Sequence, residues 1–203
     1  MTLGRSDEDR VEITDKDAFR VQEYAALRET IRTRAGARPL VALAGVAVWA
    51  AIMLGVLIGL QNPLAAVVPL LVLVTAFEAV RSLHLGVERI GRYLQVFFEE
   101  SSASADAALA PPAWERTAMI FGPSTPGAGG HPLFFPVFFM ATIVNMIAVV
   151  LPGPLPIEIG TMLVPHVAFV LWMLFCERGM RKQRTTELAR YRALKKDSPL
   201  RGS

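Results

Sequence analysis

The sequence predicts an all-α, polytopic membrane protein with four transmembrane helices, arranged as two hairpins with cytoplasmic helical extensions. Three observations lead to this prediction. The chain has 203 residues and is 53% apolar, with a mean hydropathy of +0.41. Its apolar residues are concentrated in four long runs, whereas soluble domains disperse them in periodic patterns. All 21 lysines and arginines lie outside those runs and outside the two short connections between them.

The four apolar runs cover residues 39–60, 63–80, 133–151 and 159–176. Each has roughly 18 to 22 residues, which is about the length that a helix needs to cross ~30 Å of hydrocarbon. Residues 1–38 mix basic and acidic side chains and lack the pattern of a cleaved signal peptide. We therefore expect the first run to act as its own insertion signal.

Basic residues predict the orientation of these spans, because short basic flanks stay on the cytoplasmic side of a membrane. The connections at 61–62 and 152–158 contain no lysine or arginine. Both termini are therefore predicted to be cytoplasmic, with the two turns outside. The basic flanks precede the first run and follow the second and fourth, at Arg28, Arg32, Arg34, Arg38, Arg81, Arg89, Arg92, Arg178, Arg181, Lys182 and Arg184.

The chain divides into five segments on this reading. They are a cytoplasmic N-terminal amphipathic helix (1–38), a first transmembrane hairpin with a long helical extension (39–100), a flexible cytoplasmic linker (101–132), a second transmembrane hairpin (133–176), and a basic cytoplasmic C-terminal helix and tail (177–203).

The three cytoplasmic helices are predicted from local patterns. Thr14 is the expected N-cap of the first, which should enter the membrane at Arg38 and Pro39. No proline interrupts residues 70–100, so the second is one helix of roughly 35 residues, about 50 Å long. The third is strongly basic. We expect the three to meet in a small bundle, with the alternative that the basic helix lies along anionic lipid.

Four small residues recur at strict i+4 spacing in the first span. Such residues let helix backbones approach closely within a membrane. We expect this stripe to pack against the second or fourth span, and oligomerisation is the alternative. The stripe consists of Ala47, Ala51, Gly55 and Gly59.

Three polar residues lie within the predicted spans. Asn145 and His166 are the deepest, and we expect them to hydrogen-bond across the second hairpin. The alternative is a functional site, since ionisable groups inside a membrane often mark one. Glu78 lies near the inner boundary, one turn before Arg81, and is expected to form an ion pair with it. A proton or cation site is the alternative for Glu78.

The extension of the second span carries candidates for contact with a partner protein. This helix carries an apolar stripe on one side and a polar stripe on the other. Aromatic side chains are common anchors at protein interfaces. A metal site needs three or four ligands and is not expected here. The candidate contact residues are His84, Glu88, Arg92, Tyr93, Leu94 and Phe97.

Motifs of other function classes are missing from the sequence. We find no phosphate-binding loop and no catalytic constellation, and a single cysteine, Cys176, excludes an internal disulfide. The net charge of +3 is too small and dispersed to indicate nucleic acid binding. No cofactor is predicted.

Residues 24–31, 77–97 and 114–116 resemble a group of bacterial integral membrane proteins that carries no assigned activity. The resemblance implies a four-span protein of the bacterial inner membrane and transfers no functional residue.

We therefore expect a scaffold, accessory or interaction subunit that works through its cytoplasmic helices and the lipid bilayer. The alternative is an oligomeric channel or small transporter assembled through the small-residue stripe. A lipid-modifying enzyme that uses His84 or His166 is a third interpretation, which lacks the clustered acids and histidines of such chemistry.

Overall fold

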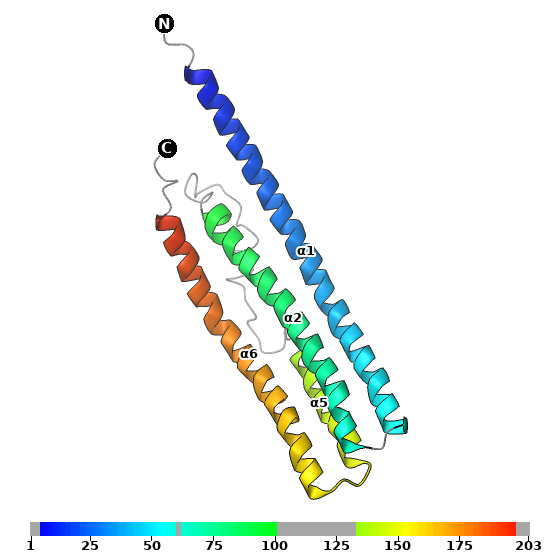
Figure 1. Ribbon diagram of the computed structural model, residues 1–203. Helices are drawn as coiled ribbons and strands as arrows, with labels where there is room; N and C mark the ends of the chain where they lie inside the picture. The colour runs from blue at the N-terminus through cyan, green and yellow to red at the C-terminus, as the bar shows by residue number, and fades with distance from the viewer. Residues whose placement is uncertain (1–4, 60–61, 101–132, 198–203) are drawn as a thin grey trace.

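The computed structural model describes residues 5–59, 62–100 and 133–197, and side chains from residue 18 onward apart from that of Arg181. Every element in these ranges is helical (Figure 1). The elements are α1 (Arg5–Gly59), a short 3₁₀ helix η1 (Pro63–Ala66), α2 (Val67–Leu94), a π-helical turn η2 (Gln95–Glu99), α5 (Phe135–Val150) and α6 (Pro156–Asp197). The predicted linker over 101–132 lies outside the described residues.

Three of the helices are long and apolar enough to cross a membrane. They are α1 from Ala18, the segment Pro63–Glu99, and α6. The predicted helical class is confirmed, and three of the expected apolar runs lie in helices long enough to cross a membrane. The remaining apolar run forms α5, which has 16 residues and a length of about 24 Å.

Local backbone geometry explains why α5 is shorter than the run of 133–151 predicted from the sequence. The preceding residue, Phe134, has a left-handed conformation with φ of 52°, and Pro136 occupies the first turn, where its missing N–H costs nothing. After the helix, Pro152 and Gly153 turn the chain, and Gly153 has a positive φ of 71°.

Helix α1 corrects one prediction. The helix begins at Arg5, so Thr14 is inside it and is not an N-cap. It continues through Pro39 as one rod of 55 residues, so the predicted point of membrane entry at Arg38 and Pro39 lies within a continuous helix. A proline in a helix interior removes a backbone hydrogen bond and usually kinks or breaks the helix, yet α1 continues through Pro39. The predicted long helix over 70–100 is present as α2 followed by η2, whose five residues are π-helical.

The helices form an elongated bundle (Figure 1). Helices α1 and α6 flank α2, and α5 occupies the part of the bundle next to the turns. The connections that follow α1 and α5 lie at one end, and both chain ends lie at the other. Helix α1 extends beyond its neighbours at the end that carries the termini.

The apolar core lies between α1, α2, α5 and α6. Phe77 is fully buried and makes edge-to-face contacts with Phe138 at 5.6 Å and Phe169 at 5.8 Å between ring centroids. Such contacts add to the burial of large aromatic surfaces. Phe77 of α2 thereby packs against both α5 and α6.

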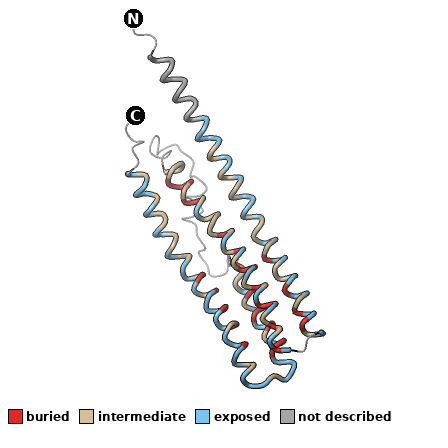
Figure 2. The backbone as a smooth tube through the Cα atoms, in the orientation of Figure 1, coloured by how far each residue is buried: buried red, intermediate tan, exposed pale blue. Residues whose placement is uncertain are grey.

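Exposed residues line the outward side of the helices (Figure 2), and in the half of the bundle next to the turns many of them are large and apolar. A water-soluble protein seldom exposes contiguous apolar surface of this extent. These faces and the lengths of the helices are those of a membrane protein. The large exposed side chains include Leu40, Leu43, Leu54, Ile58, Ile143, Ile147, Val164, Leu171 and Phe175.

Candidate functional site

A polar network lies in the centre of the apolar bundle. The amide oxygen Oδ1 of Asn145, on α5, accepts a hydrogen bond from Trp49 Nε1 at 3.0 Å. Its Nδ2 donates to the carbonyl oxygen of Ala66 at 2.9 Å and to His166 Nε2 at 3.0 Å. His166 Nδ1 in turn donates to the carbonyl oxygen of Met162 at 2.7 Å. The network therefore joins α1, η1, α5 and α6.

The pattern of donors determines the state of the histidine. Because Nε2 of His166 accepts from Asn145, the ring is neutral and its proton is on Nδ1. All N–H groups of both side chains are engaged, and both side chains are buried. A satisfied buried network specifies one arrangement of the helices. These hydrogen bonds thereby link α1, η1, α5 and α6 at one point.

The predicted hydrogen bond between Asn145 and His166 is confirmed, but their other partners were not predicted. The signal for Trp49 was present in the sequence, since it carries the only side-chain N–H group of the first apolar run. The sequence does not show that Trp49 faces α5. Ala66, whose carbonyl accepts this hydrogen bond, is the last residue of the short 3₁₀ helix before α2.

Glu78 forms the predicted ion pair with Arg81, with 2.7 Å between Oε2 and Nη2. A third partner comes from α6. Trp172 Nε1 donates to Glu78 Oε1, and the guanidinium carbon of Arg81 lies 5.5 Å from the centre of a Trp172 ring. This cluster connects α2 and α6 where the apolar face ends.

The expectation that the small-residue stripe packs within the chain is wrong. Ala47, Ala51, Gly55 and Gly59 are all exposed. A Cβ atom added at Gly55 or at Gly59 would meet no other atom within 4 Å. The stripe lies on the outer side of α1, because Trp49, Met53 and Val56 occupy the inner face.

The close approach between α1 and α2 uses a different glycine. A Cβ atom at Gly45 would lie 2.3 Å from the Cβ of Ala76, which no real pair of side chains tolerates. Gly45 shares the inner face of α1 with Ala42 and Trp49, at the helical spacing of three and four residues. That spacing was a signal available in the sequence.

The predicted contact residues of α2 lie largely inside the bundle. Leu94 is fully buried, so this predicted contact residue presents no surface to a partner. The physical reason is that α1 and α6 cover this end of α2 from both sides. His84 and Arg92 are also buried, with 8% and 3% of their surface exposed.

His84 contacts α1 through a single hydrogen bond. Nη1 of Arg38 donates to His84 Nδ1 at 2.8 Å, so the neutral ring carries its proton on Nε2. Burial lowers the pKa of His84, the carboxylate of Glu88 raises it, and the positive charges of Arg38 and Arg92 lower it further. The net direction is downward, which favours the neutral ring.

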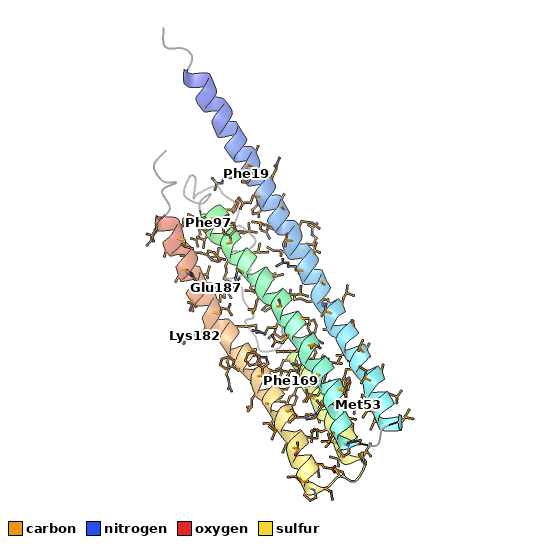
Figure 3. The ribbon with its side chains drawn as sticks, viewed as in Figure 1. Phe19, Met53, Phe97, Phe169, Lys182 and Glu187 are labelled. Carbon is orange, nitrogen blue, oxygen red and sulfur yellow. The ribbon has the colours of Figure 1, made fainter. Side chains whose placement is uncertain are left out.

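Arg92 joins α2 to α6. Its guanidinium lies 3.1 Å from a carboxylate oxygen of Glu187 and 3.6 Å from one of Glu88. Figure 3 labels Glu187 on α6, beside this stretch of α2. Gln183 supports the carboxylate of Glu187 with a hydrogen bond of 2.7 Å. The enclosed arginine therefore pairs with Glu187 between α2 and α6 and with the more exposed Glu88 within α2.

Aromatic side chains complete the contact between α1, α2 and α6. The ring of Tyr93 contacts those of Phe97, Phe98 and Tyr191, with centroid distances of 4.8, 6.1 and 6.2 Å. The hydroxyl of Tyr93 donates to Glu23 at 3.0 Å. Burial and this carboxylate raise the pKa of Tyr93. The predicted three-helix bundle is therefore present.

The last turns of the basic helix pack against η2, as the prediction of a bundle requires. Arg192 pairs with Glu100 at 2.8 Å, and Lys195 donates to the carbonyl oxygen of Val96. These contacts hold the last turns of α6 against η2. The carboxylate of Glu100 raises the pKa of Arg192.

No group of three histidine, cysteine, aspartate or glutamate side chains suited to a metal ion occurs in the described part of the chain. Comparison with protein families, with curated proteins and with solved structures finds no match to this chain.

Proposed function

We propose that this chain is a four-span protein of the bacterial cytoplasmic membrane and that it serves as a scaffold or accessory subunit for a protein partner. In this proposal α1, α2, α5 and α6 are the spans, and both termini are cytoplasmic. The three-helix bundle at the end of the termini then projects into the cytoplasm.

One observation carries the proposal, namely the contrast between the two ends of the bundle. The end with the turns exposes apolar side chains and has no lysine or arginine in its connections. The other end has its charges organised in contacts between helices, such as Arg92 with Glu187 and Arg192 with Glu100. Because basic flanks are retained in the cytoplasm, this contrast supports the orientation.

Helix α5 is included as a span although it is short. A helix of about 24 Å is below the ~30 Å hydrocarbon thickness, and a membrane adapts to such a mismatch by thinning at modest cost. Leu133, Phe134 and Leu151 add apolar residues at the two ends of α5.

Reporter fusions test the orientation. Alkaline phosphatase, which is active only outside the cytoplasm, is fused after residue 62, after residue 105, after residue 153 and at the C-terminus. Alkaline phosphatase activity is expected only in the fusions after residues 62 and 153. Activity at the C-terminus or after residue 105 would refute the orientation, and inactivity after 153 would show that α5 does not cross.

A photo-crosslinking amino acid tests the scaffold role. The exposed apolar side chains of the cytoplasmic bundle are Phe19, Val21 and Leu194, with 67%, 69% and 54% of their surface exposed. The crosslinker in place of Phe19 is expected to form a protein adduct of defined mass in the native host. The matched control is Leu54, which faces lipid in the proposed orientation. Equal adducts at both positions, or none at Phe19, Val21 and Leu194, would contradict the proposal.

An oligomeric channel or small transporter is the second candidate, and the exposure of the small-residue stripe favours it. Cysteine in place of Gly55 or Gly59, with Cys176 replaced by serine, tests this candidate by disulfide crosslinking in native membranes. A dimer or larger species at these positions, and none at Leu54→Cys, would support assembly through the stripe. A monomer throughout would contradict the pore.

A further inference from the structure

Two arginines of α1 lie across α2 at the end of its apolar part. Arg34 and Arg38 are one turn apart and therefore share a face of α1. Nη1 of Arg38 is held by His84 at 2.8 Å. Nη1 of Arg34 lies so close to Gly86 that a Cβ atom there would be 2.7 Å away. Each guanidinium is thereby positioned by one residue of α2.

The charges of these two arginines are not balanced by acids. Nearby Glu88, the closest acid along α2, is already paired with Arg92 at 3.6 Å. Among the described side chains, neither Arg34 nor Arg38 forms an ion pair. The Nε–H of Arg38 is enclosed and has no hydrogen-bond acceptor in this part of the structure. This enclosed donor is not open to a ligand from outside, but Arg34 is exposed and Arg38 is half-buried. The outer N–H groups of these two guanidinium groups are therefore the donors that an anion would satisfy.

The position of this crossing at the edge of the apolar face indicates which kind of anion would bind there. Pro39 and Leu40 follow Arg38 directly, and Leu40 and Leu43 are the first side chains of the outward apolar face, with 68% and 69% of their surface exposed. In the orientation proposed above, on which this inference rests, the two guanidinium groups lie at the depth of the phosphates of the cytoplasmic leaflet.

We propose that Arg34 and Arg38, where they cross α2 at Gly86 and His84, form a site for the phosphate of an anionic phospholipid. A guanidinium presents N–H groups in a planar fork that matches phosphate oxygens, and it binds them in pairs. Two such forks one turn apart receive one headgroup. A lipid with a net negative charge is favoured over a zwitterionic one, because no carboxylate neutralises the two arginines.

Lipid titration of the purified full chain in neutral detergent tests this site. Phosphatidylglycerol and phosphatidylcholine are the two probes, and binding is followed by native mass spectrometry. Phosphatidylglycerol is expected to bind more tightly to the unmodified chain. The double variant Arg34→Gln, Arg38→Gln is expected to bind it about thirty-fold more weakly, which at about 1.4 kcal/mol per tenfold corresponds to about 1 kcal/mol for each lost arginine.

A matched control removes the same charge from the same end of the bundle. Arg32 is exposed and pairs with Glu29, and Arg178 is exposed on α6. The variant Arg32→Gln, Arg178→Gln is expected to keep its affinity for phosphatidylglycerol within about threefold.

A glycine substitution tests the geometry without any change of charge. In Gly86→Ala the new Cβ displaces the guanidinium of Arg34, so the affinity for phosphatidylglycerol is expected to fall about fivefold. The helix itself becomes more stable, because alanine is the better helix former. Gly36→Ala is the control, since a Cβ atom there has no other atom within 4 Å.

Three results would overturn the site. The first is an equal loss of affinity for phosphatidylglycerol in the two double variants. The second is binding of phosphatidylcholine as tight as that of phosphatidylglycerol by the unmodified chain. The third is full displacement of phosphatidylglycerol by inorganic phosphate, which would show a site for free anions. The lipid preference of the unmodified chain is measured even if a variant does not fold. These measurements are made in detergent, so a failure of the proposed orientation appears only in the reporter fusions and is distinguishable.

Discussion

Removal of the Asn145 side chain tests the central polar network most directly. Asn145→Ala deletes three hydrogen bonds at once, to Trp49 Nε1, to the carbonyl of Ala66 and to His166 Nε2. Hydrogen bonds between helices in a membrane average about 0.6 kcal/mol each, which gives about 2 kcal/mol for three. The former partners then remain buried without a hydrogen bond, which costs about 1–3 kcal/mol more. We expect a total loss of about 3–5 kcal/mol in the free energy of unfolding.

Reversible unfolding in mixed micelles, with increasing fractions of a denaturing detergent, measures this loss. Ile143→Ala is the matched control on α5, because Ile143 points outward with 46% of its surface exposed and has no polar partner. The control is expected to change the free energy of unfolding by less than about 1 kcal/mol.

A double-mutant cycle separates the contact with Trp49 from the other effects. Trp49→Phe removes the N–H donor and keeps an aromatic ring, and we expect a loss of about 1 kcal/mol. In the double variant with Asn145→Ala the two losses are expected to be less than additive, since both delete the same hydrogen bond. Strict additivity, or a loss in Asn145→Ala no larger than in Ile143→Ala, would refute the structural role of the network.

Three further predictions concern contacts between helices. Gly45→Ala places a Cβ atom 2.3 Å from that of Ala76 and is expected to destabilise the chain by about 1–3 kcal/mol, whereas Gly55→Ala meets no atom within 4 Å and should be neutral or stabilising in the same unfolding assay. Because burial lowers the pKa of His84 below its usual value of 6.5, the unfolded chain binds more protons at this position. The free energy of unfolding is therefore expected to fall as the pH drops through 6.5, and to stop falling once the pH is below the pKa of His84 in the folded chain. His84→Gln should remove this part of the pH dependence of unfolding. Arg92→Ala removes the enclosed guanidinium from the partly exposed carboxylates of Glu187 and Glu88 and is expected to cost about 1.5–3 kcal/mol. Arg92→Met together with neutral replacements of both acids should restore most of that loss, and no recovery would contradict the ion-pair interpretation.

Patterns within single segments determined the helical class, the apolar spans and the predicted orientation. The reason is that the length of an apolar run and the position of basic flanks act locally, through the transfer of each segment between water and hydrocarbon. The ion pair of Glu78 and Arg81 was predictable on the same grounds, because residues three apart are neighbours on any helix.

Only the tertiary structure decided which side of each helix faces inward. The stripe of Gly55 and Gly59 and the inner face with Gly45 both have helical spacing, and in an apolar segment hydrophobicity does not distinguish the face toward lipid from the face toward protein. The partners of Asn145 and the burial of Leu94 depend likewise on helices distant in the sequence. The physical reason is that packing and hydrogen bonding between helices are set by contacts across the bundle, and no local pattern encodes the rotation of one helix against the next.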